Sequence, residues 1–440
     1  MCGVLGAVDL AIGEAALSLL QHRGPNGHGL EMVSCAGRNV WLAHARLSIL
    51  DLSPAGHQPM PSRDRRWWVT FNGEIYNHLE LRNELPGPFR GHSDTETLVE
   101  LIAAQGVESV LPRLNGMFAF AALDTLTGRL FLARDPFGIK PLYFLNSGKS
   151  LVFASELRAV NAVLQSAGLP APGLDRLALQ QFLTLRYTPS PSTLWQGIQR
   201  LAPGHMLSVD LASGMSSQTC YARATGERFT GTLDEAVECY QGKLAEAVER
   251  QLLSDVPVGI LLSGGIDSAL VAAMAKDAGM LAPCFTVGFG GGHQECEIDD
   301  AAHTARTLGL PFNKVLISPE QLRSVLPSIV RSIEEPLGTT SVMPMWELVK
   351  RAREDVTVVL TGQGTDEPWG GYYRYQVELL RNILGSPALW RAGGALLSFW
   401  KGKPESLERG FRSLSEVEPV NQIIEAACLF TAGVADGTGG

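Results

Sequence analysis

Val258–Val271, VGILLSGGIDSALV, is the stretch that decides the fold of the second half of the chain. It begins with an apolar run that is typical of a buried parallel strand. A glycine-containing turn, Ser263–Ser268, follows, and Ala269–Met274 is typical of a helix. A strand, a glycine turn and a helix in this order point backbone N–H groups and the positive end of the helix dipole at an anion. The stretch therefore predicts a phosphate-binding loop in an α/β domain.

The turn differs from the phosphate loop that ends in a lysine followed by Ser or Thr. It ends in Asp267-Ser268, and an aspartate at this place suits Mg²⁺ that bridges to phosphate oxygens. Its two glycines, Gly264 and Gly265, let the main chain approach an anion closely, while Ser263 and Ser268 add hydroxyl donors. The alternative is a strand–helix turn with incidental glycines. The string Ser-Gly-Gly-Ile-Asp-Ser resembles the pyrophosphate loop of ATP pyrophosphatases, which favours phosphate binding.

Strands and helices alternate around this loop. Buried strands are predicted over 284–289 and 356–360, with helical segments between them. Such alternation predicts a doubly wound parallel sheet, in which ligands bind at the carboxyl ends of the strands. Both the turn at 263–268 and the glycine-containing stretch Thr361–Glu367 follow directly after a predicted strand. We therefore expect them to form one site.

The bulk composition excludes several classes of protein. The chain has 440 residues, enough for two or three domains, and 45% of them are hydrophobic. Its net charge of −9 offers no basic surface for nucleic acid or an anionic membrane, and it contains no apolar run long enough to cross a bilayer. No basic segment typical of a signal peptide precedes the first apolar residues. The 7 cysteines are scattered and form no CxxC pair, so we expect a reducing cytoplasm and neither a disulfide framework nor a zinc site.

The first half of the chain opens with Met1-Cys2-Gly3, so that removal of Met1 would make Cys2 the N-terminal residue. Its α-amino group would have an ordinary pKa of about 7.7–8.0, low enough to accept the thiol proton at neutral pH. N-terminal threonine nucleophiles are activated in the same way. A cysteine at position 2 has no such role in most proteins, so the surrounding motifs must decide whether Cys2 is a nucleophile.

Several such motifs follow in order. They are His22-Arg23-Gly24-Pro25, Arg46–Ile49, Asn72–Asn77, Gly91–Glu96, Leu114–Phe120, Ala133–Tyr143 and Phe153–Glu156. Together with Met1-Cys2-Gly3, this series resembles the class II glutamine amidotransferase domain over roughly residues 2–160. The resemblance implies an N-terminal-nucleophile hydrolase with a four-layer αββα sandwich. It departs from the family pattern at Asn26, where Asp is more common.

This resemblance also implies a reaction. The Cys2 sulfur would attack the carboxamide carbon of glutamine, and the resulting oxyanion needs hydrogen-bond donors. By resemblance these donors are the Asn72 side chain and the Gly73 N–H.

The same resemblance assigns the two charged ends of glutamine. Arg46 would bind the α-carboxylate, because a guanidinium pairs well with it. Asp94, with Glu74 nearby, would bind the α-ammonium. The alternative for these three residues is ordinary surface ion pairing, which their place in an ordered set of motifs disfavours.

Residues from about 235 to 375 resemble the synthetase domain of class B asparagine synthetases, the glutamine-hydrolysing type. The positions that would hold the adenosine part of ATP are Leu261, Val287 and Gly362, with Thr361 where the family often has Ser. Those that would take the pyrophosphate are Ser263, Gly264, Gly265, Asp267 and Ser268. Asp267 and Asp366 would bind Mg²⁺.

The resemblance implies a two-step reaction of amino-acid biosynthesis. ATP and aspartate would give β-aspartyl-AMP and pyrophosphate, and ammonia from the glutaminase site would then displace AMP to form asparagine. The implied ligands are thus small molecules, namely glutamine, ATP with Mg²⁺, and aspartate or another carboxylate. Homodimers are common in the family.

The synthetase half departs from the family pattern at three places. Gln363 stands where many relatives have an acid that helps to form the acyl-adenylate, and Gln has no titrating group. Thr339 stands where an Asp is common. Relatives continue beyond residue 440 with a catalytic Lys and a Glu-Val-Arg-x-Pro-Phe segment. We find neither within 376–440, where helices are expected over 377–384 and 422–429.

The sequence therefore predicts two domains. Residues 2–205 are expected to form the amidotransferase domain with a crossover, and residues 206–440 a C-terminally shortened synthetase domain. Three functions remain open: an asparagine synthetase, an amidotransferase acting on another carboxylate such as a sugar acid or a secondary metabolite, and a glutaminase whose synthetase half is incompetent. A β-lactam synthetase is a weaker rival, because those relatives lack the cysteine nucleophile.

Overall fold

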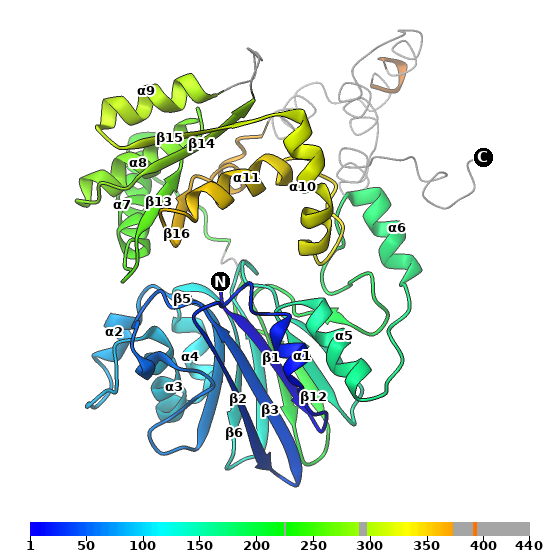
Figure 1. The fold of residues 1–440 in the computed structure, drawn as a ribbon. Coiled ribbons are helices and arrows are strands. Elements are labelled where there is room, and N and C mark those ends of the chain that lie inside the picture. Colours follow the sequence, from blue (N-terminus) through cyan, green and yellow to red (C-terminus); the bar gives the residue numbers. More distant parts are fainter. Residues whose placement is uncertain (224–225, 290–296, 373–389, 394–440) are drawn as a thin grey trace.

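The structure is a computed structural model that describes residues 1–223, 226–289, 297–372 and 390–393. In Figure 1 the N-terminal half forms a sandwich of antiparallel sheets, and the C-terminal half forms a parallel sheet flanked by helices. The helices expected over 377–384 and 422–429 lie outside the described residues. Within the described ranges, no helix combines the length and the apolar character needed to cross a membrane.

The first sheet has six strands in the order β10-β8-β9-β1-β3-β2. They are β1 (Gly3–Val8), β2 (Gly27–Cys35), β3 (Arg38–Arg46), β8 (Tyr143–Asn146), β9 (Leu151–Ala154) and β10 (Gln199–Arg200). Every residue of β1 is buried, because the strand pairs with β3 and β9 and has both of its faces covered. Cys2 directly precedes this central strand, so the core of the sandwich fixes its position.

The second sheet also has six strands, in the order β12-β11-β7-β6-β5-β4. They are β4 (Met60–Pro61), β5 (Trp67–Ile75), β6 (Gly116–Asp124), β7 (Arg129–Arg134), β11 (His205–Asp210) and β12 (Ser216–Cys220). β5 pairs with β6 over its whole length, and this places Asn72 opposite Ala119. The sheet continues beyond residue 205, because β11 pairs with β7 on one side and with β12 on the other.

Three apolar clusters hold this half together. One lies between the two sheets and includes Val4, Leu42 and Leu132. The second packs the outer face of the second sheet against α3 (Asp94–Gln105) and α4 (Val107–Val110), and the third packs the first sheet against α1 (Glu14–Ser18) and α5 (Leu157–Ser166). The remaining helical elements are α2 (His78–Arg82), α6 (Arg176–Leu185), η1 (Pro54–Gly56) and η2 (Leu111–Arg113). The layers confirm the expected αββα sandwich.

The C-terminal half is built on a parallel sheet in the order β15-β14-β13-β16. Its strands are β13 (Val258–Leu261), β14 (Cys284–Phe289), β15 (Phe312–Ile317) and β16 (Val358–Thr361). Its helices are α7 (Leu233–Gln251), α8 (Ile266–Asp277), α9 (Ile298–Leu308), α10 (Pro319–Ser332), α11 (Val342–Ala352) and α12 (Asp366–Trp369). Residues of α7, α8 and α9 pack in one apolar cluster with the sheet, and residues of α11 pack in another. This confirms the doubly wound parallel sheet.

Polar contacts among the described residues join the two halves, and three groups of them matter below. The first joins Asp255 to the loop after β3, where its backbone N–H donates to the Ile49 carbonyl oxygen at 3.0 Å. The second joins the segment before α11 to the sandwich through the ion pairs Arg158–Glu334 and Arg200–Glu335. The third is an exposed ion pair between α7 and α2, Arg250–Glu80, at 2.9 Å.

Candidate functional site

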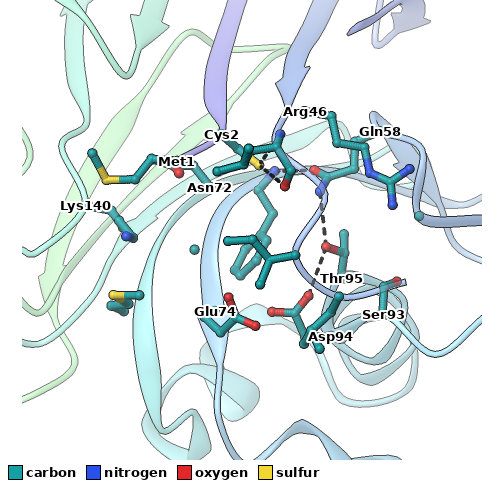
Figure 2. A pocket seen from close by; sticks show the side chains of 17 residues that line it. Met1, Cys2, Arg46, Gln58, Asn72, Glu74, Ser93, Asp94, Thr95 and Lys140 are labelled. Atoms are coloured by element: carbon teal, nitrogen blue, oxygen red, sulfur yellow. Dashed lines mark hydrogen bonds between the residues drawn. The ribbon is translucent and has the colours of Figure 1, made fainter. Parts of the chain in front are cut away.

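A cavity at the edge of the sandwich collects residues from β3, β5 and α3 and from the chain start just before β1 (Figure 2). The six residues that sequence analysis predicted for the first site all line it: Cys2, Arg46, Asn72, Gly73, Glu74 and Asp94. They come from separate segments of the chain, and the pairing of β1 with β3 and of β5 with β6 brings them together. The cavity therefore unites motifs that lie far apart in the sequence.

Cys2 is held by its backbone and by its sulfur. Its carbonyl oxygen accepts a hydrogen bond from Nε of Arg23 at 2.9 Å, and Arg23 is itself paired with Glu156 at 3.1 Å. Its Sγ accepts the N–H of Leu47 at 3.4 Å. Burial raises the pKa of the Cys2 thiol, and the Leu47 N–H opposes this only in part. The thiol is thus well placed but needs a base to become a nucleophile.

The N-terminal amine lies in the same enclosed region. Burial lowers the pKa of the Met1 ammonium to about 6, and the nearby cations Arg23 and Lys140 act in the same direction. The Met1 amine is therefore mainly the free base at neutral pH, which is the protonation state of a proton acceptor.

Asn72 and Gly73 lie on β5 next to Cys2. The Asn72 side chain is buried, and neither its Nδ2 nor its Oδ1 has a hydrogen-bond partner among the described residues. Buried amides are nearly always paired, so this side chain is arranged for a ligand. A Cβ atom on Gly73 would lie 2.3 Å from the Met117 carbonyl oxygen, so the close approach of β6 requires glycine here.

Two carboxyl groups face each other across the cavity from Cys2, those of Glu74 and Asp94 (Figure 2). Asp94 begins α3 after the N-cap Ser93, and its Oδ2 accepts the N–H of Ile75 at 3.0 Å. Burial raises the pKa of both groups, and the charge of Asp94 helps to raise that of Glu74 to about 9. Two buried acids side by side are costly to ionise, so the arrangement is suited to binding a further positive charge.

Arg46 ends β3, and the loop that follows holds its guanidinium. Nη1 donates to the Ser53 carbonyl oxygen at 2.9 Å, and Nη2 donates to the carbonyl oxygen of Asp51. A Cβ atom on Gly56 would lie 2.0 Å from Arg46 Nη2, so a glycine makes room for the side chain. A guanidinium has five N–H donors, and those not engaged by the loop can meet an anion.

The cavity also contains residues to which sequence analysis gave no role. Gln58 links two walls, because its Nε2 donates to the Thr95 hydroxyl at 3.1 Å and its Oε1 accepts the Phe71 N–H at 2.7 Å. Lys140 is buried in the cavity wall, and burial lowers its pKa. The motif that contains Lys140 was recognised, but its distance from Cys2 in the sequence gave no sign that the two meet.

The second predicted site lies on the C-terminal sheet, where the turn Ser263–Ser268 closes on itself. The Ser263 N–H donates to Oγ of Ser268 at 3.0 Å, and the Gly265 N–H donates to Oγ of Ser263 at 3.1 Å. These hydroxyls, expected as phosphate donors, accept hydrogen bonds within the turn itself. Within the described part of the chain, no side chain caps the start of α8, so its first N–H groups face outward as at an anion site.

One backbone N–H of this turn donates to an acidic side chain. The Gly264 N–H donates to Oε2 of Glu297, just before α9, at 3.0 Å. Sequence analysis gave Glu297 no part in the turn. The contact shows that this backbone N–H is placed to donate to an anionic oxygen.

The stretch Thr361–Glu367 lies against the same turn. β13 and β16 are neighbours in the sheet, and a Cβ atom on Gly362 would lie 2.6 Å from the Ser268 N and 3.0 Å from the Asp267 Cβ. The Thr361 Oγ1 accepts the Gln363 N–H at 3.0 Å. The close contact confirms that the two loops adjoin at the carboxyl ends of their strands.

The remaining predicted residues of this half lie at the same edge of the sheet. Leu261 ends β13 and packs in one apolar cluster with Val287 of β14. Asp366 begins α12. Across the described ranges, no group of three or more His, Cys, Asp or Glu side chains is arranged to hold a metal ion.

Comparison with known proteins gives a match for each half. Residues 1–221 match the family model of the glutamine amidotransferase domain, and residues 240–422 match that of asparagine synthase. The chain is 35% identical to asparagine synthetase (glutamine-hydrolyzing) 1 of Bacillus subtilis (strain 168), over 82% of this chain and 56% of that protein. It is 30% identical to asparagine synthetase (glutamine-hydrolyzing) 3 of the same organism, over 84% of this chain and 63% of that protein.

A relative with a different name also matches. The chain is 32% identical to amidase chyE of Penicillium rubens, over 83% of this chain and 56% of that protein. In each of these three matches the chain spans less than two thirds of the relative's length.

Proposed function

Because the chain belongs to the family in which a glutamine amidotransferase domain is joined to an asparagine synthase domain, we propose that it is a glutamine-dependent amide-forming ligase. The observation that carries this proposal is the cavity at Cys2. It joins an enclosed thiol, a buried Asn72 amide that has no hydrogen-bond partner among the described residues, and the two acids Glu74 and Asp94. This set of groups complements the reacting and the charged parts of glutamine.

In the first half-reaction, Cys2 acts as the nucleophile after removal of Met1. The α-amino group of Cys2 takes the thiol proton, and Sγ attacks the carboxamide carbon of glutamine. The Asn72 Nδ2 and the Gly73 N–H donate to the oxyanion of the tetrahedral intermediate. The C–N bond breaks and ammonia leaves with the proton. Water then hydrolyses the thioester to glutamate and restores the thiol.

Each charged group of glutamine binds side chains of the opposite charge. The guanidinium of Arg46 binds the α-carboxylate through donors that the loop does not use. Glu74 and Asp94 bind the α-ammonium. Since the pKa of Glu74 is raised to about 9 in the free protein, the ammonium releases the Glu74 proton as it binds. Glu74 thus becomes a carboxylate only when the substrate ammonium is bound.

The second half binds ATP at the paired loops. Gly264, Gly265 and the start of α8 would meet the pyrophosphate, with Ser263 and Ser268 fixing the turn. Glu297 must leave the Gly264 N–H before a phosphate oxygen can take its place. Residues that would contact the adenosine are Leu261, Val287, Thr361 and Gly362. This assignment is supported by the contact between the two loops and by the shared apolar cluster of Leu261 and Val287.

Mg²⁺ suits this site because it is normally held by one or two carboxylates together with substrate phosphates. Asp267 and Asp366 are the two carboxylates that would hold it, and the ion would neutralise phosphate charge. Asp267 lies in the first turn of α8 beside Gly362, and Asp366 begins α12 directly after the loop that contains Gly362.

The carboxylate that receives the ammonia is aspartate in our proposal, which would make the product asparagine. A second candidate is the same chemistry on another carboxylic acid. Gln363 favours this candidate, because its amide cannot accept a proton from ammonia as an acid at this position would. Thr339 favours it also, since this segment carries a hydroxyl where the family pattern has a carboxylate.

Two assays test the proposal. The protein should release glutamate from glutamine, and Cys2→Ala should abolish this release. A protein with Cys2 at its N-terminus that releases no glutamate would refute the assignment of the first half. Pyrophosphate release with ATP, Mg²⁺ and a panel of carboxylic acids tests the second half. Pyrophosphate release with aspartate supports asparagine synthesis, and release with another acid instead supports the second candidate. If no acid gives release, the protein is a glutaminase whose second half does not activate a carboxylate.

A further inference from the structure

Asp255 belongs to the C-terminal half but contacts two loops of the N-terminal cavity. It lies in the short connection between α7 and β13. Its Oδ2 accepts the backbone N–H of Asp51 at 2.7 Å and lies 2.7 Å from Nε2 of His92. Its own N–H donates to the Ile49 carbonyl oxygen. One carboxylate therefore joins two segments that are distant in the sequence.

The first of these segments, residues 47–56, carries one end of the proposed glutamine pocket. The carbonyl oxygens of Asp51 and Ser53 hold the guanidinium of Arg46. Ile49 and Leu50 line the cavity wall. A shift of Asp51 would therefore move the group that binds the α-carboxylate.

The second segment carries the other end. His92 directly precedes Ser93 and Asp94, which both line the cavity. The two segments are also joined to each other, because the His92 N–H donates to Oδ2 of Asp51 at 2.9 Å. Asp255 thus closes a ring of contacts that sets the distance between the Arg46 side and the Asp94 side of the cavity.

We propose that Asp255 is a positioning residue through which the C-terminal domain sets the glutamine affinity of the N-terminal site. The inference rests on the proposed glutaminase function. Asp255 does not line the cavity, so it acts on the substrate only through the two segments that it holds. The N-terminal site is then complete only when the C-terminal domain is docked on it.

A second contact across the same interface provides the control. Arg250 pairs with Glu80 of α2 at 2.9 Å, and neither residue lines the cavity. This pair is exposed, so its removal should change the docking of the two domains little. It therefore controls for the loss of a polar contact across the interface that holds neither segment.

The test compares Asp255→Ala, Asp255→Asn and Glu80→Gln in the full chain, using glutamate release at increasing glutamine concentrations. We expect Asp255→Ala to raise KM for glutamine about 10-fold, the size expected for losing two hydrogen bonds, with kcat within about twofold of the unmodified protein. Asp255→Asn keeps an oxygen acceptor for the Asp51 N–H and should give an intermediate KM. Glu80→Gln should leave both constants unchanged.

Two results would overturn the inference. An unchanged KM in folded Asp255→Ala would do so, as would an equal rise of KM in Asp255→Ala and Glu80→Gln. If Asp255→Ala does not fold, Asp255→Asn decides: a raised KM supports positioning and an unchanged one refutes it. Absence of glutamate release from the unmodified protein would instead refute the proposed function, and the inference with it.

Discussion

Burial and a neighbouring negative charge both raise the pKa of the Glu74 carboxyl group. Glu74 is 8% exposed, and its Oε1 has no hydrogen-bond partner in the described part of the chain. Burial first, and then the charge of Asp94, raises its pKa from 4.5 to about 9. The free protein therefore keeps Glu74 protonated at neutral pH and holds a proton that the unfolded chain would release.

The first prediction concerns the stability of Glu74→Gln. Between pH 4.5 and about 9 the folded state binds this proton and the unfolded state does not. The free energy of unfolding of the unmodified protein therefore falls as pH rises through this window. Glu74→Gln removes the titration, so its stability relative to the unmodified protein should rise by roughly 2–3 kcal/mol between pH 5 and pH 7. Urea unfolding at both pH values measures it, and parallel pH profiles would contradict it.

The second prediction separates activity from stability at Asn72. Its buried amide has no partner among the residues described, so its removal breaks no hydrogen bond of the free protein. Asn72→Ala should change the melting temperature little while lowering kcat for glutamate release by roughly 10²–10³, as for loss of one oxyanion donor. Thermal unfolding and steady-state kinetics of the same preparation test this. A variant that lost stability but kept its kcat would contradict it.

At the scale of single elements, His44 on β3 is a titratable group inside the sandwich. Its Nε2 lies 3.0 Å from the Phe71 carbonyl oxygen on β5, so the ring joins the two sheets. Burial lowers its pKa from 6.5 to about 3. The folded protein therefore holds His44 neutral under conditions in which the unfolded chain would bind a proton.

The third prediction follows from this difference. Between pH 6.5 and about 3 the unfolded state binds the additional proton, so the stability that neutral His44 preserves is lost as pH falls. His44→Gln keeps an N–H donor for Phe71 but does not titrate. Its loss of stability between pH 7 and pH 5 should be smaller than that of the unmodified protein by roughly 2 kcal/mol. Equal losses, measured by denaturant unfolding, would disprove it.

The elements themselves could largely be predicted from the sequence because their signals are local. Ser93 does cap α3, with its Oγ accepting the Glu96 N–H, and β14 spans the predicted residues 284–289. The six cavity residues were predicted from motifs that, taken together, resemble the class II glutamine amidotransferase domain. Gln58, Lys140 and Asp255 could not be found in this way. Their roles depend on which loops meet after the sheets and domains have packed, and no local pattern encodes that.

On the scale of the whole molecule, a chain of polar contacts joins Cys2 to the C-terminal domain. Arg23 contacts the Cys2 carbonyl oxygen and Glu156, and Arg158 pairs with Glu156 at 2.9 Å. Arg158 also pairs with Glu334 of the other domain at 2.5 Å, where the Glu334 side chain is 14% exposed. The backbone of Cys2 and the segment before α11 are thus held by one connected network.

The fourth prediction uses this network. Glu334→Ala would leave Arg158 without its partner across the interface, and partly buried pairs are stronger than exposed ones. We expect calorimetry to show the two domains unfolding in more separated transitions than in the unmodified protein. Arg250→Ala, which removes the exposed pair with Glu80, should leave the transitions as they are. Identical traces for Glu334→Ala and the unmodified protein would contradict the prediction.

The enclosed amino end of the chain determines how the protein must be produced. An affinity tag, a leader or an acetyl group in front of Cys2 would block the amine that the proposed mechanism needs and would crowd a cavity that Met1 already lines. Tags therefore belong elsewhere on the chain. A preparation in which the host has removed Met1 only in part would be a mixture of active and silent molecules. The fraction lacking Met1, read from the intact mass, should equal the fraction of sites that turn over glutamine.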